Sequence, residues 1–95
     1  MAKVQVSFLA ELRIMTRSKS VEVTVEEGET IRTLLSKLSE RFGEGFRRVV
    51  FESEAETRKN VIIRQNGENI ATKKGLETPV MAGDLIVIMP AVAGG

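Results

Sequence analysis

The feature that most constrains the fold is a run of five consecutive apolar residues, Leu85 to Met89, near the carboxyl end of the sequence. A continuously apolar strand is typical of a strand that is covered on both faces, and such a strand lies in the interior of its sheet. The last strand of this chain is therefore expected to insert between earlier strands, most simply beside the first one.

Alternating patterns predict two strands near the amino end. In residues 3–10 the even positions are apolar, namely Val4, Val6, Phe8 and Ala10. Residues 21–25 alternate again, with β-branched side chains at the apolar positions. Each pattern is typical of a strand with one buried face. Residues 16–20 between them are short and polar, which predicts a hairpin.

A single amphipathic helix is predicted after Gly28, where the spacing of the apolar residues changes. One apolar stripe recurs at helical intervals and consists of Ile31, Leu34, Leu35, Leu38 and Phe42. Thr30 is suited to the N-cap of this helix and Gly43 to its C-cap. The apolar residues within 46–51 predict a further helical turn over the core, whereas the mostly charged residues 52–59 predict a solvated loop.

The order of these elements favours one architecture. Residues 61–64 are rich in β-formers, and Asn66-Gly67 suits a type I′ turn, so we expect a hairpin that returns through Ile70. With the last strand in the centre, the order β-β-α-β-β-β predicts an α+β fold of the β-grasp, or ubiquitin-like, type. This is a mixed sheet of four to five strands with one main helix across one face. At 95 residues we expect a single β-grasp domain, residues 1–95, with residues 90–95 as a flexible tail.

Composition excludes most catalytic and metal-binding classes. The sequence contains no cysteine and no histidine, so disulfides, thiolate or imidazole metal sites, Ser-His-Asp triads and Cys-His dyads are impossible. The glutamates at 52, 54 and 56 lack the pattern of a calcium loop, and no metal site is expected. With 14 Lys and Arg against 13 Asp and Glu, the net charge is +1, so nucleic acid is not an expected partner.

No feature of the sequence indicates a membrane partner. The alternation that follows Lys3 is unlike the continuous apolar stretch of a signal peptide. The longest uncharged run, residues 85–95, has 11 residues, and a helix needs roughly 20 to span a bilayer. A cytoplasmic location is therefore expected.

The carboxyl terminus is the segment that points to chemistry. No charged residue follows Asp84, and Gly94-Gly95 ends the sequence soon after the predicted central strand. A tail of six residues extends about 20 Å at roughly 3.3 Å per residue, enough to enter another protein's active site. Glycine has no Cβ and passes through channels too narrow for other residues. The terminal carboxylate, ionised at neutral pH, can attack the α-phosphate of ATP and form an acyl-adenylate, which a sulfur donor or an amine then displaces.

Three segments carry a resemblance to a known family. Phe8 to Arg13 is similar to a Phe-Ala-x-x-Arg stretch, Gly75 to Val80 to a Gly-Leu-Asp-Thr-Pro-Leu turn, and Gly83 to Gly95 to a Gly-Asp, apolar strand, Pro-Pro-Val-x-Gly-Gly ending. On these motifs the sequence resembles the MoaD/ThiS family of ubiquitin-like sulfur carriers, most closely the small subunit of molybdopterin synthase. It departs from the family at Ala91, where a second proline is usual, at Ile14, where Glu is usual, and in the added length of residues 44–59.

The resemblance implies a carrier without catalytic activity of its own. An activating enzyme of the ubiquitin-activating type would adenylate Gly95, using ATP and magnesium, and the product would be a thiocarboxylate at that residue. In molybdopterin synthase the sulfur passes to a pterin precursor inside the large subunit, in an assembly expected to be a heterotetramer. No cofactor would be permanently bound. Gly94 would give the tail passage, and the segment that guides it is Pro90, Ala91, Val92 and Ala93.

Other acceptors stay open. The longer form of the chain also resembles archaeal small modifiers, which are joined through the terminal glycine to lysines of other proteins. It further resembles ubiquitin-related carriers for tRNA thiolation, and the family includes carriers for thiamine synthesis. A plain interaction module with a Gly-Gly end that arose by chance is a third interpretation.

Side-chain parity predicts a docking surface for the partner enzymes. If the even positions of the first strand face the helix, Leu9 faces away, because strand side chains alternate. On the last strand, Val87 and Met89 would then lie on the uncovered face. Parallel pairing would bring Leu9 beside Met89 where the tail leaves, and an outward apolar pair there is typical of a partner surface. Arg13 would add a charge at its rim.

Overall fold

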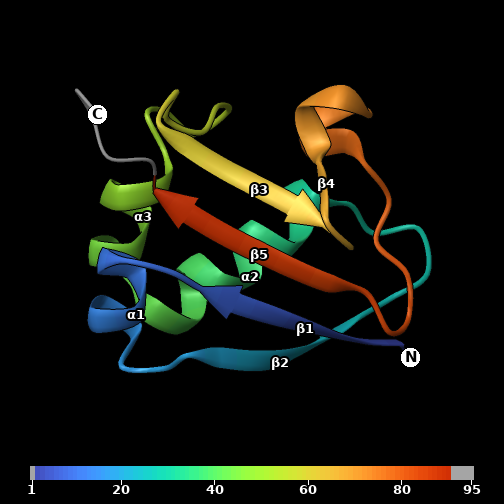
Figure 1. Cartoon of the computed structure of the whole chain (residues 1–95), viewed down its shortest axis with the longest axis horizontal. Helices are drawn as coiled ribbons and strands as arrows, with labels where there is room; N and C mark the ends of the chain where they lie inside the picture. Colours follow the sequence, from blue (N-terminus) through green and yellow to red (C-terminus); the bar gives the residue numbers. More distant parts are fainter. Residues whose placement is uncertain (1, 91–95) are drawn as a thin grey trace.

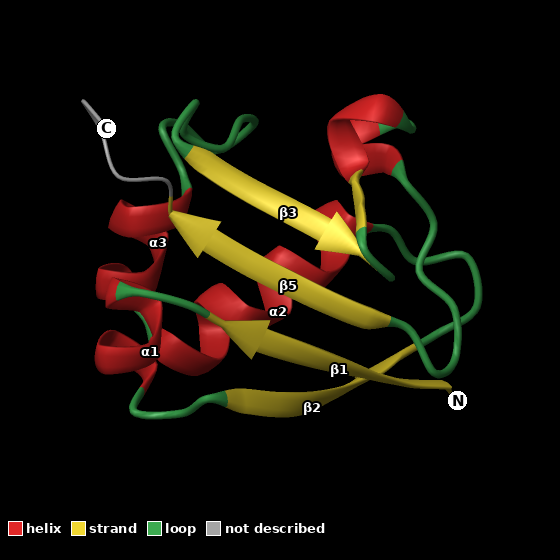
Figure 2. Ribbon diagram, viewed as in Figure 1, coloured by secondary structure: helices red, strands yellow, loops and turns green. Residues whose placement is uncertain are grey.

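The chain is described from a computed structural model, in which the described residues are 2–90 (Figure 1). Helix α2 runs diagonally behind a twisted sheet, and α1 and α3 lie at the end of the sheet where β1 and β5 terminate (Figures 1 and 2). In chain order the elements are β1 (Ala2–Phe8), α1 (Glu11–Thr16), β2 (Ser20–Val25), α2 (Ile31–Phe42), α3 (Glu44–Val50), β3 (Val61–Gln65), β4 (Glu68–Asn69), the 3₁₀ helices η1 (Ile70–Thr72) and η2 (Gly75–Glu77), and β5 (Leu85–Pro90).

The predicted β-grasp topology is confirmed. The strand order is β2-β1-β5-β3-β4, so the last strand occupies the centre of a five-stranded mixed sheet. Strand β5 runs parallel to β1, with Val6 opposite Ile86, and antiparallel to β3, with Ile63 opposite Ile88. Strand β1 also pairs antiparallel with β2. The chain has thus placed its last strand between its first and third.

The core lies between the sheet and α2. The inward residues of the two central strands and all of the apolar stripe of α2 except the partly buried Phe42 are fully buried, namely Val4, Val6, Phe8, Ile31, Leu34, Leu35, Leu38, Ile86 and Ile88. At the end of the sheet the Phe8 ring meets the Phe42 ring edge-on, with centroids 5.6 Å apart, and the Phe46 ring at 6.2 Å. Such pairs add stabilisation beyond the area they bury. This aromatic contact joins α3 to the end of β1.

The connection between β1 and β2 differs from the predicted hairpin loop. The two strands do pair, but the chain between them forms helix α1, whose Leu12 is fully buried. Strand β1 ends at Phe8, and Ala10 is exposed rather than directed toward α2. Six helical residues are too few to display an apolar period, so tertiary burial of Leu12 stabilises a helix that the pattern of the sequence does not reveal.

Ala10 adopts a backbone conformation that suits glycine, with φ 55° and ψ −134°. A side chain at this φ costs of order 1–3 kcal/mol. We expect Ala10→Gly to raise the free energy of unfolding by about 1 kcal/mol, because relief of strain exceeds the entropy that glycine adds to the unfolded chain. Urea unfolding measures the difference. The matched control is Ala82→Gly, at an exposed turn position without positive φ, which should lower the free energy of unfolding. If Ala10→Gly also lowered it, the strain inferred at Ala10 would be contradicted.

The segment from residue 44 to residue 70 largely follows the prediction. Phe46 and Val50 of α3 are fully buried, and residues 52–56 form an exposed loop. Asn66 and Gly67 both have positive φ, 51° and 88°, as a type I′ turn requires. The returning strand β4 has only two residues before η1 begins, because the Asn69 side chain accepts a hydrogen bond from the Ala71 N–H and turns the chain away from β3.

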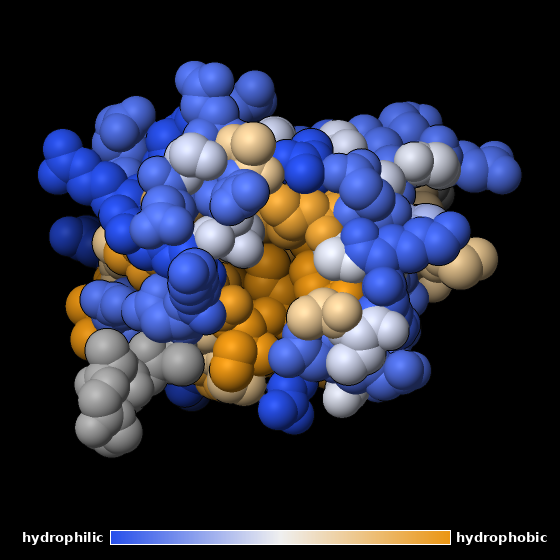
Figure 3. All heavy atoms as spheres, turned by 90° about the horizontal axis from the view of Figure 1, so that it is seen from above, coloured by the Kyte–Doolittle hydropathy of each residue, from blue (hydrophilic) through white to orange (hydrophobic). Residues whose placement is uncertain are grey.

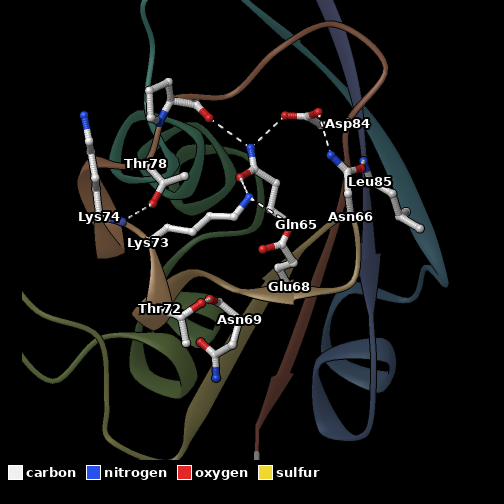
Figure 4. Close-up of polar contacts among 11 residues, drawn as sticks. Gln65, Asn66, Glu68, Asn69, Thr72, Lys73, Lys74, Thr78, Asp84 and Leu85 are labelled. Atoms are coloured by element: carbon white, nitrogen blue, oxygen red, sulfur yellow. Dashed lines mark hydrogen bonds and ion pairs between the residues drawn. The ribbon is translucent and has the colours of Figure 1, made fainter.

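A buried polar network fixes the start of β5 (Figure 4). The carboxylate of Asp84, the single aspartate of the sequence, accepts hydrogen bonds from Gln65 Nε2 at 2.8 Å, Asn66 Nδ2 at 2.9 Å and the Met81 N–H at 2.8 Å. Lys73 Nζ in turn donates to Gln65 Oε1 at 2.8 Å. Burial would raise the pKa of the Asp84 carboxyl, but these donors and the Lys73 charge together hold it below its ordinary value.

Replacement of Asp84 by asparagine should destabilise the fold by about 2 kcal/mol at pH 7. Both carboxylate oxygens accept hydrogen bonds, and the amide NH₂ that replaces one of them is itself a donor, so a buried N–H group would lose its acceptor. The carboxyl pKa is lower in the folded state than in the unfolded chain. The stabilisation that comes from its ionisation is therefore fully present at pH values above the ordinary carboxyl pKa, near 4. This stabilisation is lost as the pH falls through the lower pKa of the folded state. Between pH 7 and about pH 3, the free energy of unfolding measured with urea should fall less for Asp84→Asn than for wild type. Glu27→Gln, at an exposed carboxylate, should show the same fall as wild type. A fall in Asp84→Asn as large as that of wild type would contradict this role of Asp84.

Candidate functional site

Strand β5 extends to Pro90, one residue beyond the predicted strand Leu85 to Met89. Pro90 was predicted to belong to the tail, but it is the buried last residue of β5 and lies opposite Val61 of β3. The Leu9 N–H donates to the Ile88 oxygen at 3.1 Å, and β1 has already ended before this point. Proline lacks an N–H, and at the end of the β1 pairing none is needed. Residues 91–95, with the predicted tail residues Ala91 to Gly95, lie outside the described residues.

The predicted parity of β5 is confirmed. Ile86 and Ile88 are fully buried against α2, whereas Val87 and Met89 are half-buried on the opposite face of the sheet. The helices lie behind the sheet in Figures 1 and 2 and do not cover this outer face. The run Leu85 to Met89 therefore has one face in the core and one at the surface, and the expectation that both faces would be covered is wrong.

Leu9 lies near the end of β5. The parallel register of β1 and β5 ends at Phe8 and Ile88, and beyond it the Leu9 N–H donates to the Ile88 oxygen. A contact of Leu9 with Met89 stays a prediction. Leu9 is half-buried and lies in the short connection between β1 and α1. The structure thus brings both residues to the end of the sheet where β5 terminates.

The structure adds one residue that the sequence analysis missed. Ile62 of β3 pairs with Met89 and is half-buried on the same outer face. The sequence contains a feature that could have predicted this position. Residues 61–63 are all apolar, and because strand side chains alternate, burial of Ile63 directs Ile62 to the outer face. We name the four half-buried residues Leu9, Ile62, Val87 and Met89 the outer patch.

Arg13 has a structural contact that its predicted role did not include. It lies exposed on α1, and its Nε donates to the Phe8 oxygen at 3.1 Å. This hydrogen bond satisfies a carbonyl at the end of β1, where the chain turns into Ala10. A contact between Arg13 and a partner stays a prediction.

Residues 2–90 contain no group of three or more carboxylates placed to hold a metal ion. The pKa of Glu29 is lowered by its hydrogen bond from Lys37, and that carboxylate, like Asp84, is engaged within the fold. A charged hollow of about 390 Å³ lies beside α3, lined by side chains of both signs such as Glu44, Arg47 and Arg58. In the same part of the chain, no helix has the length and apolar character to cross a membrane.

The fold and this site define a class. A β-grasp sheet with its last strand in the centre, an outer apolar patch at the end of that strand and a Gly-Gly sequence beyond it are together the features of a ubiquitin-like protein. The chain belongs to the ThiS family, whose model matches residues 6–95. It is therefore a member of the ubiquitin-like sulfur carriers, and the family resemblance of the sequence motifs is confirmed.

Two relatives show the range of names within this family. The chain is 35% identical over 66 residues to a candidate sulfur carrier protein of Archaeoglobus fulgidus, a match that covers 70% of this chain and 74% of that protein. It is 26% identical over 93 residues to small archaeal modifier protein 3 of Haloferax volcanii, covering 98% and 99% of the two chains.

Solved structures extend the comparison. The chain resembles one in the BexX/CysO complex of Amycolatopsis orientalis, with TM-score 0.79 and 33% identity, covering 97% of this chain and 99% of that one. It also resembles a candidate molybdopterin converting factor subunit 1 of Pyrococcus furiosus, with TM-score 0.77 and 25% identity over 97% and 100% of the chains.

Proposed function

We propose that the chain is a sulfur carrier for molybdopterin biosynthesis, in which Gly95 is adenylated and then converted to a thiocarboxylate. The observation that carries this proposal is the position of β5. The strand that precedes Gly94-Gly95 in the sequence is the central strand of the sheet, and it is hydrogen-bonded to β1 on one side and to β3 on the other. The reactive carboxylate would therefore follow a strand whose position is fixed by two neighbours.

The chemistry needs the carrier's carboxylate and a partner enzyme. One Gly95 carboxylate oxygen attacks the α-phosphorus of ATP, a P–O bond forms, and pyrophosphate leaves. The outer sulfur of a donor persulfide then attacks the acyl carbon and displaces AMP, which gives an acyl disulfide. A thiol attacks the donor sulfur of that disulfide, the S–S bond breaks, the thiocarboxylate leaves, and the thiol and the donor are left as a new disulfide. Magnesium bound with ATP in the activating enzyme would neutralise phosphate charge. None of these steps requires a histidine, a cysteine or a metal site on the carrier.

The fold determines how such a tail would meet its partner. The five residues beyond Pro90 span at most about 17 Å, at roughly 3.3 Å per residue. An active site that holds Gly95 must therefore approach the end of β5 closely. The outer patch lies at that end, and we propose that it contacts the activating enzyme and, in turn, the large subunit of molybdopterin synthase.

Two final acceptors have specific support. The similarity to the molybdopterin converting factor subunit favours a pterin precursor. The similarity to small archaeal modifier protein 3 covers nearly all of both chains and favours the alternative function, a modifier whose Gly95 carboxyl forms an isopeptide bond with a lysine of a target protein. Both functions share the adenylation step.

Intact mass of the protein purified from its native cells distinguishes the acceptors. Exchange of one carboxyl oxygen for sulfur adds about 16 Da, and this product is expected for the carrier. Fragmentation should locate the added mass at Gly95. Covalent products joined through lysine side chains would identify the modifier instead. Finding only unmodified protein, in cells that are making molybdopterin, would contradict the carrier function.

A further inference from the structure

The outer edge of β3 is only partly paired. Strand β4 has two residues, and they pair with Arg64 and Gln65 alone. Within residues 2–90, the remaining β3 residues, Val61 to Ile63, have no strand partner on the side away from β5, and of their main-chain donors the Val61 N–H is already bonded to the Arg58 oxygen at 3.0 Å. An unpaired strand edge is a template on which an extended segment can form main-chain hydrogen bonds.

An apolar groove lies beside this edge. Seen from above in Figure 3, apolar side chains gather in a hollow between hydrophilic walls. The groove holds about 130 Å³ and is lined mainly by Thr57, Val61, Ile63, Ile70, Ala71 and Leu76. One wall is the loop that precedes β3, and the other is formed by η1 and η2. The floor therefore continues directly from the unpaired half of β3.

The two walls are held in place by one side chain from α2. Arg32 Nε donates to Glu77 of η2 at 2.7 Å, and Arg32 Nη1 donates to the Ala55 oxygen of the opposite wall at 2.8 Å. A bridge between Phe51 and Thr57 closes the loop upon itself. The groove is thus already formed in the free protein, which lowers the ordering cost of a ligand.

Charge at the groove favours an acidic ligand. Lys59 and Lys74, each next to a lining segment, are exposed and form no ion pair within the described residues. The carboxylates of Glu68 and Glu77 on the η1/η2 side are already paired with Lys73 and Arg32. On the loop wall, Glu56 is exposed and also forms no ion pair within the described residues, while Glu52 and Glu54 line the hollow beside α3 instead. Beside the groove, the two unpaired lysines therefore outnumber the one unpaired carboxylate.

We propose that this groove binds an extended segment of a partner protein, which adds to the β3 edge as a strand. One apolar side chain of the segment enters the hollow, and acidic residues on either side of it face Lys59 and Lys74. A helix is excluded as the ligand because its main-chain groups are satisfied internally and cannot pair with β3. The proposal is independent of the chemistry at Gly95, since the groove lies at the β3 edge and the outer patch on the sheet face.

The test is titration of the isotope-labelled whole chain with a capped synthetic peptide, Asp-Glu-Val-Ile-Val-Asp-Glu, followed by amide shifts in NMR. We expect saturable changes at residues 61–63 and 71–76 with Kd below about 1 mM. The same peptide with alternate main-chain amides methylated keeps its side chains but cannot pair as a strand, and it should not bind. Absence of saturable changes, or equal binding of the methylated peptide, would overturn the proposal.

Charge reversal supplies the second arm. Lys59→Glu combined with Lys74→Glu should weaken peptide binding at least about tenfold, because attractive charge pairs become repulsive. Lys19→Glu, at an exposed lysine in the α1–β2 connection, is the matched control and should leave binding unchanged. Well-dispersed spectra verify that each variant is folded. Equal affinities of the double variant and the control, or shift changes centred on the outer patch, would refute the assignment.

Discussion

A chain extended by one residue beyond Gly95 is expected to lose adenylation by its activating enzyme by at least about 100-fold. The extra residue converts the Gly95 carboxylate into an amide and moves the terminal carboxylate by up to about 3.6 Å. A displacement of 1 Å from productive geometry already costs about 100-fold in favourable cases. Pyrophosphate release with the cognate activating enzyme measures the effect. A wild-type rate for the extended chain would contradict the mechanism.

Gly94→Val tests the passage of the tail separately. Valine adds a branched side chain beside the reacting carboxylate, so we expect a similar loss of pyrophosphate release with the carboxylate itself unchanged. Ala82→Val, at an exposed turn near the opposite end of β5, is the matched control and should retain the wild-type rate. Thermal unfolding of all three proteins should agree closely, because neither substitution replaces one of the buried residues of the core between the sheet and α2.

Elements with long or strict patterns could be predicted from the sequence. The twelve residues of α2 are enough to show the helical stripe, and the alternation of β1 and β2 shows which side chains face it. The central position of β5 follows from apolar residues at both parities. The physical reason proved different, however, because Val87 and Met89 form a surface patch rather than a second buried face.

The parts that escaped prediction depend on contacts between distant residues. Helix α1 has six residues, and it is stabilised by burial of Leu12 and by the bond from Arg13 to the end of β1. The positive φ of Ala10 is imposed by the same turn and has no glycine to announce it. Strand β4 ends early because the Asn69 side chain favours η1 over continued pairing. No local pattern encodes these outcomes.

The candidate site also has parts that the sequence predicts and one part that needs the structure. Gly94-Gly95 alone indicates the reactive carboxylate, and the alternation of β5 indicates the outward residues of the outer patch on that strand. The place of Ile62 in the outer patch required the register between β3 and β5. The outer patch is thus assembled from three separate segments of the chain. Only the fold brings them to one end of the sheet, beside the residue from which the tail begins.

A charge placed in the outer patch is expected to weaken binding to the activating enzyme. Met89 lies on the central strand next to Pro90, with Ile62 opposite it on β3, and the Leu9 N–H donates to the oxygen of the preceding residue, Ile88. If a partner covers this patch when the tail is engaged, Leu9→Asp or Met89→Asp leaves a carboxylate buried without a partner. The cost should reach at least about 2 kcal/mol, or roughly 30-fold in Kd, as for a central interface residue.

Thr24→Asp provides the matched control on the same face of the sheet. Thr24 is exposed on β2 and lies opposite Lys3, at the end of the sheet away from the outer patch. It introduces the same charge into a strand, so any general effect of charge on the sheet should be equal in both variants. We expect it to bind with wild-type affinity.

Calorimetric titration against the activating enzyme and the synthase large subunit decides between the outcomes. Leu9 and Met89 are half-buried rather than in the core, so the melting temperatures of both aspartate variants should change little. Weakened binding with an intact fold assigns the outer patch to the interface. Unchanged affinity for both partners, or unfolding of the variants, would mean that the partner approaches the tail from another face, since the tail spans too short a distance for a remote surface to be involved.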